Sequence, residues 1–164
     1  MTVSAPDRER LQVDYLAAWN ARDAERIASF FAADATYDDR GAGQIARGRA
    51  AIAAHAARIH AAFPDLTFEL VRSAHGDGFS AGEWRSEMTH QGEIEGLAPT
   101  GRRVRSAGVD VATLDAEGLI RHLVSYYDGA QLLRDLGVLP ARGSRAERAL
   151  ARLASLRTRA LRRG

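Results

Sequence analysis

The spacing of apolar residues changes at Pro64, and this change constrains the fold more than any other feature of the sequence. Before Pro64, apolar residues recur three and four positions apart, which is the spacing of helices. After Pro64, they alternate with polar residues in runs separated by short turns, which is the spacing of half-buried strands. Helices followed by such strands indicate an α+β architecture. We therefore expect a curved antiparallel sheet wrapped around the N-terminal helices.

Local signals place each element along the chain. Helices are predicted over about residues 7–21, over a segment capped by Asp23 with the apolar stripe Ile27, Phe30 and Phe31, and over residues 48–63 and 129–136. Strands are predicted over about residues 35–37, 67–73, 79–91, 102–114 and 119–127. Residues 40–48 contain three glycines and are expected to form a loop. A curved sheet that faces a helix encloses a hollow, and apolar hollows bind small molecules.

The residue types that are missing exclude whole classes of chemistry. The 164 residues contain no cysteine, and all 23 basic residues are arginine. Disulfides, thiolate nucleophiles and Schiff bases on a lysine side chain are therefore excluded. The five histidines lack metal-ligand spacing and no glycine-rich phosphate loop is present, so we expect neither a metal nor a cofactor. Carboxylates, histidine, tyrosine and serine remain for chemistry.

Length and hydropathy indicate one globular domain. The hydrophobic residues make up 46% of the chain, and we assign the domain to residues 1–140. No apolar run approaches the roughly 20 residues that span a bilayer. Residues 1–10 contain no apolar signal core, so we expect the protein in the cytoplasm.

The net charge of +2 hides an asymmetry between the domain and the tail. Residues 1–140 hold 15 arginines and 20 acids, a net charge of −5, whereas residues 141–164 hold eight arginines and one acid, a net charge of +7. Residues 144–162 have an amphipathic pattern whose apolar stripe consists of Leu150, Leu153, Leu156 and Ala160. Such a helix packs on a dimer partner or on its own body, or it binds an acidic protein or an anionic surface. The tail has no interleaved aromatic residues, so no nucleic acid is expected.

One acid, Asp110, lies between Val109 and Val111 in the strand predicted over residues 102–114. Acids are depleted in strands, and burying one is costly unless it is hydrogen-bonded. Asp110 either points to solvent or lines an apolar cavity, where its pKa would be raised. Alternation alone does not decide between the two, because one bulge reverses the face of every following residue.

Four segments of the chain carry family signals. They are Y-L-A-A-W-N-A-R-D (Tyr15–Asp23), F-F-A-A-D-A-T-Y-D-D (Phe30–Asp39), T-H-Q-G-E-I-E-G-L-A-P-T-G-R-R-V (Thr89–Val104) and D-G-A-Q-L-L-R-D-L-G (Asp128–Gly137). The first two resemble the nuclear-transport-factor-two-like superfamily, and the last two are similar to SnoaL-like polyketide cyclases within it. The resemblance covers about residues 8–138. It implies a cone-shaped α+β domain and a homodimer packed through the sheet.

The resemblance to SnoaL-like cyclases implies a specific reaction. These enzymes close a ring by an intramolecular aldol step without a cofactor, and they use an aspartate on the last strand as acid and base. The matching segment here reads Leu123-Val124-Ser125. Ser125 therefore stands where the family has its acid, and a hydroxyl is far too weak an acid for that work.

Ketosteroid isomerase, which shares the cone fold, implies a second set of roles. Its pattern has a tyrosine and an aspartate that donate to the oxyanion and a second aspartate that is the base, at positions that match Tyr15, Asp110 and Asp39. In that enzyme an apolar site keeps the donor carboxylic acid neutral. Removing a proton next to a carbonyl requires a base near the carbon and donors at the oxygen. His90 is expected to assist as a second acid/base or as a donor to the substrate.

Together these signals predict an acid/base enzyme of natural-product metabolism. Its substrate would be a hydrophobic carbonyl compound, polyketide-like or steroid-like, that undergoes isomerisation, cyclisation or dehydration. The residues expected to contact the substrate are Trp19, Tyr37, Trp84, Met88, Ser125 and Tyr127. Two alternatives stay open: an epoxide-opening hydrolase or cyclase in which Asp39 and Asp110 share the acid and base roles, and a non-catalytic binding or scaffold protein.

Overall fold

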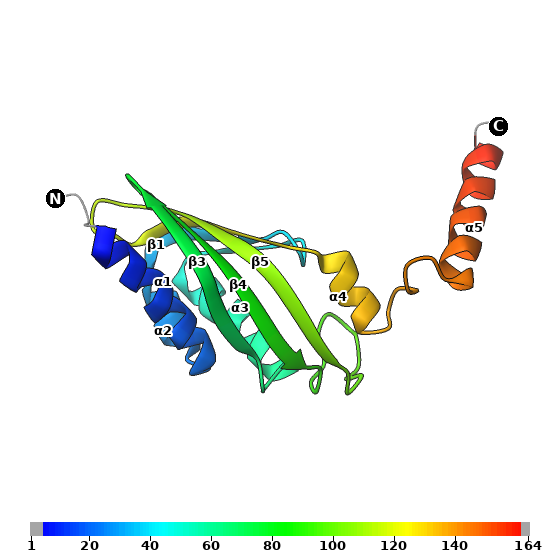
Figure 1. Ribbon diagram of the computed structural model, residues 1–164, viewed down its shortest axis with the longest axis horizontal. Coiled ribbons are helices and arrows are strands. Elements are labelled where there is room, and N and C mark those ends of the chain that lie inside the picture. Colours follow the sequence, from blue (N-terminus) through cyan, green and yellow to red (C-terminus); the bar gives the residue numbers. More distant parts are fainter. Residues whose placement is uncertain (1–4, 162–164) are drawn as a thin grey trace.

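A computed structural model describes the backbone of residues 5–161 and the side chains of residues 10–155 (Figure 1). The helices are α1 (Ala5–Asn20), α2 (Ala24–Ser29), α3 (Arg49–Ala62), α4 (Gly129–Asp135) and α5 (Arg145–Leu161). The strands are β1 (Phe31–Asp39), β2 (Gln44–Arg47), β3 (Thr67–Gly76), β4 (Phe79–Thr89), β5 (Arg103–Leu114) and β6 (Ile120–Tyr127). The predicted α+β class is confirmed.

The six strands form one curved sheet in the order β2-β1-β6-β5-β4-β3. The strands β3 to β6 follow one another as antiparallel neighbours, and β2 pairs antiparallel with β1. Strands β1 and β6 run parallel, so the sheet is mixed rather than wholly antiparallel. Short turns produce antiparallel neighbours, whereas parallel strands require a long connection. The chain between β1 and β6, which contains α3 and four strands, provides that connection.

The segment around β1 differs from the sequence-based expectation in two ways. Residues 40–48 contain the strand β2 in place of a simple loop, because β2 pairs with the end of β1 in a register that places Gln44 opposite Asp39. Phe31 begins β1 and does not continue the apolar stripe of α2, which ends at Ser29. Strand β1 therefore has nine residues and reaches the sheet edge where the candidate site lies.

Helices cover the face of the sheet that carries the buried side chains. Helix α1 packs on β3 and β4, α3 packs on β1 and β2, and α2 lies against α3. Asp23 caps α2, as predicted, by accepting the backbone N–H of Arg26 at 2.9 Å. The largest fully buried apolar side chains are Tyr15, Phe31, Ile27, Ile52, Leu66 and Leu123. Helix α4 contacts β5 beyond this core and covers the wide end of the hollow.

The predicted tail helix is present as α5, and Figure 1 shows it standing apart from the domain, beyond α4. Leu150 and Leu153 on its apolar stripe are 54% and 65% exposed, so this part of α5 does not pack on its own domain. The tail is tied to the domain by Arg134, whose Nη2 lies 3.5 Å from Oε1 of Glu147. The binding of α5 to a second copy of the chain, to an acidic protein or to an anionic surface stays a prediction. None of the described helices is long and apolar enough to cross a membrane.

Gly108 lies in the middle of β5, with Trp84 of β4 on one side and Tyr127 of β6 on the other. A Cβ atom at Gly108 would be 2.5 Å from Cζ2 of Trp84 and 2.5 Å from the backbone oxygen of Tyr126. The missing side chain therefore lets the Trp84 indole lie across β5. Since one of the two crowded atoms belongs to the backbone, a side-chain rotation alone would not make room for a methyl group.

We expect Gly108→Ala to lower the free energy of unfolding by about 1–3 kcal/mol, the range for overpacking a filled interior. Gly76→Ala is the matched control on β3, because its Cβ would be 3.5 Å from the nearest atom, Cδ1 of Phe79, which is an ordinary contact. Urea unfolding measures both variants, with the denaturant slope unchanged if only stability is affected. Equal midpoints for the two variants would contradict the proposed close approach of Trp84.

Candidate functional site

The register of the sheet places a row of polar residues at one level of its inner face. Gln44 lies opposite Asp39 in the pair β2/β1, Asp39 lies opposite Ser125 in β1/β6, and Ser125 lies opposite Asp110 in β6/β5. Residues in register on neighbouring strands, roughly 4.8 Å apart, point to the same face. Four residues that are far apart in the sequence therefore meet at one end of the hollow.

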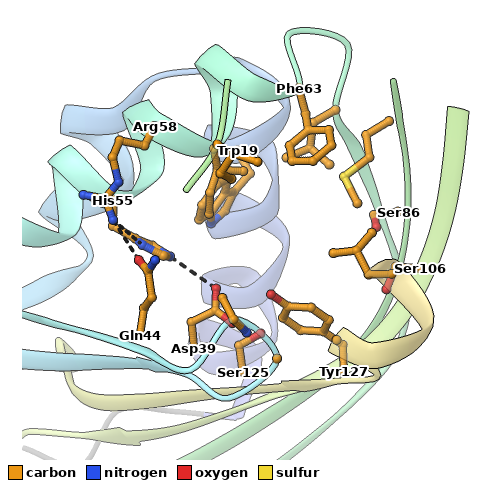
Figure 2. A pocket seen from close by; sticks show the side chains of 18 of the residues that line it. Trp19, Asp39, Gln44, His55, Arg58, Phe63, Ser86, Ser106, Ser125 and Tyr127 are labelled. Carbon is orange, nitrogen blue, oxygen red and sulfur yellow. Dashed lines mark hydrogen bonds and ion pairs between the residues drawn. The ribbon is translucent and has the colours of Figure 1, made fainter. Parts of the chain in front are cut away.

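The hollow is a cavity of about 380 Å³ between the inner face of the sheet, α3 and α4 (Figure 2). Its walls are mainly apolar and aromatic, with rings that include Trp19, Phe63, Phe68, Trp84 and Tyr127. The polar row lies at one end of these walls, and Figure 2 shows Asp39, Ser125 and Tyr127 together there. An apolar cavity with a few converging polar groups is the typical form of a small-molecule site.

Asp110 is buried and lines this cavity, which is one of the two orientations that the sequence left open. Its Oδ1 accepts a hydrogen bond from Nε1–H of Trp84 at 2.9 Å. Burial raises the pKa of Asp110 from 3.8 to about 6, while hydrogen bonds from Ser125 and Trp84 partly oppose the rise and the charge of Asp39 adds to it. Asp110 therefore titrates close to neutral pH and can donate a proton or a hydrogen bond.

Asp39 is the last residue of β1 and is buried beside the loop that leads to β2. Its Oδ1 accepts the backbone N–H of Ala42 at 2.9 Å, and its Oδ2 lies 3.4 Å from Nε2 of His55. The preceding residue, Asp38, faces the other side of the sheet and pairs with Arg40 at 2.8 Å. A carboxylate that lines a cavity can act as a base if it is placed next to the proton it removes, and Asp39 lines this cavity.

Two tyrosines in the cavity wall remain neutral. Burial raises the pKa of Tyr127 far above its usual value, and the charge of Asp39, to which the Tyr127 hydroxyl donates, adds to this rise. Burial also raises the pKa of Tyr37, with further contributions from Tyr15 and Asp110. Both hydroxyls are therefore hydrogen-bond donors at any physiological pH.

His55 is a residue of the site that sequence analysis did not select. Its ring is buried in the cavity wall, with Nε2 facing Asp39 and Nδ1 3.3 Å from Nη2 of Arg58 (Figure 2). A histidine on an alanine-rich helix is usually structural or solvated, and nothing in the sequence links residue 55 with residue 39. His60 on the same helix has that structural role, because its Nε2 bonds the backbone oxygen of Trp19 at 3.1 Å.

All six residues predicted to contact the substrate line the cavity, whereas two of the four predicted catalytic residues do not. The six are Trp19, Tyr37, Trp84, Met88, Ser125 and Tyr127. Tyr15 is buried behind the wall, with its ring against Trp19 and its hydroxyl without a hydrogen-bond partner among the described residues. His90 is fully buried against Phe63, and its Nδ1 accepts the backbone N–H of Thr100 at 3.1 Å. Neither side chain lines the cavity.

The positions of the arginines bear on the epoxide-opening alternative, which favours an arginine between the two acids. Arg85 and Arg105 are exposed on the outer face of the sheet. Arg58 lines the cavity, but its Nη2 is bonded to Oε1 of Gln44 at 2.8 Å and faces His55. Among the described residues, no three His, Cys, Asp or Glu side chains could hold a metal ion.

Comparison with known proteins places the chain among SnoaL-like proteins. A sequence profile described as the SnoaL-like domain matches residues 13–123. AclR, a candidate hydroxylase from Streptomyces galilaeus, is 26% identical with a TM-score of 0.74, and the alignment covers 95% of this chain and 97% of AclR. No curated protein matches the chain significantly.

Two further solved structures are similar over the domain. SalBIII is an epoxide hydrolase/cyclase-like enzyme with a role in pyran ring formation in the polyether salinomycin. It is 26% identical with a TM-score of 0.63, covering 74% of this chain and 91% of SalBIII. IdmH, a candidate polyketide cyclase from Streptomyces antibioticus, is 22% identical with a TM-score of 0.67, covering 79% of this chain and 98% of IdmH. At this identity the likeness to IdmH shows the fold alone.

We expect the stability of the protein to fall by about 3 kcal/mol, relative to Asp110→Asn, as the pH rises from about 4 to about 7. The raised pKa of Asp110, about 6 against 3.8, means that the folded state holds this proton after the unfolded state has released it. The stabilising contribution is therefore complete below pH 3.8 and is lost as the pH passes 6. Asparagine keeps an acceptor for Trp84 and does not titrate.

Urea unfolding of both proteins across this pH range measures the difference, and contributions from the other titrating groups cancel in it. A difference that stays constant with pH would show that the Asp110 carboxyl is solvated or ion-paired.

Proposed function

This chain belongs to the SnoaL-like domain family, and we propose that it is an acid/base enzyme that uses only its own side chains. The substrate is a hydrophobic carbonyl compound, polyketide-like or steroid-like, of natural-product metabolism. The reaction begins with proton transfer next to the carbonyl and leads to isomerisation, cyclisation or dehydration. The proposed site of action, the cytoplasm, stays a prediction.

The observation that carries this proposal is the pair of carboxyl groups held in different surroundings within one apolar cavity. Asp39 has donors facing both of its oxygens, whereas burial holds Asp110 near pKa 6. Two carboxyls in different surroundings within one site allow one to act as a base and the other as an acid. A binding protein would have no need for two such carboxyls.

In the proposed mechanism, Asp39 takes a proton from the carbon next to the substrate carbonyl. The electron pair of the broken C–H bond moves to the carbonyl oxygen, where protonated Asp110 donates a hydrogen bond to the developing negative charge. Tyr15 does not line the cavity, so Tyr37 or Tyr127, which stay neutral, would supply the second donor. Return of the proton to another carbon completes an isomerisation, and attack of the enolate on a second carbonyl closes a ring.

The position of Asp110 also accounts for the serine at residue 125. SnoaL-like cyclases carry their acid on the last strand, where this chain has Ser125. Asp110 lies opposite Ser125 on the neighbouring strand and faces the same cavity. A carboxyl group is therefore available at the same level of the sheet, displaced by one strand.

An epoxide-opening hydrolase or cyclase is the second candidate, and the 26% identity with SalBIII favours it. In that reaction Asp39 and Asp110 would share the base and acid roles. The arginine arrangement weighs against it, because Arg58 is engaged with Gln44 and His55 and does not lie between the acids. Binding of a ketone without any turnover would instead support the third candidate, a non-catalytic binding protein.

We expect the protein to catalyse hydrogen–deuterium exchange next to the carbonyl of cyclic enones or polyketide ketones in D₂O. Asp39→Asn should lower the exchange rate by about 10²–10⁴-fold, the usual contribution of a general base. The matched control is Asp38→Asn, one residue away on the outer face of β1, which should keep the rate of the wild type. Proton NMR measures the loss of the exchanging signal.

If both variants exchange at the same rate, Asp39 is not the base. Opening of a model epoxide in the absence of ketone exchange would move the second candidate to first place.

The homodimer is also a proposal, and it rests on the outer face of the sheet. On this face Ile45 is 55% exposed and Tyr126 is 51% exposed, whereas Val111 is half-buried, Val124 is buried and Asp38 pairs with Arg40. Exposed apolar groups that gather on one sheet face are typical of an interface. A second copy packed on this face would bury them.

We expect light scattering coupled to size-exclusion chromatography to give the mass of a dimer. Tyr126→Asp should shift the protein towards the monomer, because it places a charge within the buried face. Val13→Asp, at an equally exposed apolar position on α1, is the matched control. A monomeric wild type, or dissociation by the control alone, would contradict an interface on the outer face of the sheet.

A further inference from the structure

Four side chains of the site form a series of contacts that joins β1, β2 and α3, and the pairing of β1 with β2 closes the series into a ring. Asp39 contacts His55, His55 contacts Arg58, and Arg58 bonds Gln44. Gln44 lies opposite Asp39 in the register of β1 and β2, which closes the ring through the sheet. Figure 2 shows these contacts along one side of the cavity.

The contact with Arg58 determines which nitrogen of His55 carries the proton. A guanidinium group has only donors, so Nδ1 of His55, 3.3 Å from Nη2, must present its lone pair. The proton of the neutral ring then lies on Nε2, which faces Oδ2 of Asp39 at 3.4 Å. This separation and the 3.3 Å between Nδ1 and Nη2 are both slightly longer than an ordinary hydrogen bond of about 2.7–3.2 Å, so both contacts of His55 are weak in the ligand-free protein.

We propose that Arg58 and His55 are positioning residues that orient the Asp39 carboxylate by holding His55 in the tautomer with its proton on Nε2. The proposal rests on the role of Asp39 in the proposed function. With its Nδ1 lone pair occupied and a proton on Nε2, His55 has no free site for a substrate proton. The base is then Asp39, and His55 presents a donor to it.

The surroundings of His55 hold its ring plane as well as its tautomer. The ring packs against Tyr37 with 5.1 Å between the ring centroids, and the side chain is almost fully buried. Gln44 fixes the guanidinium on the far side at 2.8 Å. Without Arg58, Nδ1 is free to carry the proton in part of the molecules. Only the repulsion between the bare Nε2 and the Asp39 carboxylate opposes this second tautomer, so we expect a mixture and not a complete switch.

The tautomer is measured directly by long-range ¹H–¹⁵N correlation spectra of the histidine rings of the ligand-free protein. His55→Gln assigns the His55 signals by their loss. The wild type should show a single His55 tautomer, with Nε2 protonated and Nδ1 bare. Arg58→Met should give a mixture of the two tautomers, and Gln44→Leu should give a smaller share of the second one.

Arg85→Met, at an exposed position on the outer face of β4, is the matched control and should leave the His55 signals unchanged. His60 serves as an internal reference for folding, because its Nε2 donates to the backbone oxygen of Trp19 and takes no part in the contacts of His55. Its signals should stay in place in every variant.

A proton on Nδ1 in the wild type would overturn the proposal, and so would Arg58→Met spectra identical to those of the wild type. Neither result depends on a substrate. If the expected tautomer is found and no ketone exchange occurs, the positioning role of Arg58 and His55 stands and the proposed function fails. If exchange occurs and the proton lies on Nδ1, the proposed function stands and the positioning role fails.

Discussion

The in-register pairing of β1, β6 and β5 is the constraint on which the rest of the site depends. It places Asp39, Ser125 and Asp110 at one level of the inner face, although they come from three separate parts of the chain. A shift of one residue in either pairing would turn one carboxyl to the outer face. The parallel pairing of β1 with β6 matters most, because it brings the base proposed on β1 into the antiparallel set that carries Asp110.

Burial and hydrogen bonding then give these two carboxyls different properties. Trp84 covers Asp110 because Gly108 leaves room for the indole to cross β5, and the resulting loss of solvent outweighs the hydrogen bonds from Trp84 and Ser125. Asp39 keeps a backbone donor and a histidine beside it. The same apolar walls that admit a hydrophobic substrate therefore also raise the pKa of Asp110.

Much of this arrangement could be predicted from the sequence, because it depends on local patterns. The alternation after Pro64 predicts the long strands, Asp23 predicts the start of α2, and the acid between two valines predicts an unusual carboxyl at residue 110. Strand β2 was beyond local reasoning, because its four residues form a strand only by pairing with β1. Tyr15 and His90 do not line the cavity, and the sequence does not show this for a related reason: periodicity identifies a face, but not which part of that face borders the hollow.

His55 shows where sequence reasoning ends and geometry begins. Its neighbours in the chain are alanines, and its partners are Asp39 of β1 and Arg58 one turn further along α3, which in turn bonds Gln44 of β2. Arg58 lies three residues after His55, which is the ordinary spacing of neighbours on a helix. This spacing indicates a functional role only when Asp39 is known to lie opposite. The carboxylate only accepts hydrogen bonds and the guanidinium only donates them. A neutral imidazole between the two therefore presents its protonated nitrogen to the carboxylate and its bare nitrogen to the guanidinium. The chemistry of Asp39 is therefore set jointly by a strand register and a helix face, and neither alone would specify it.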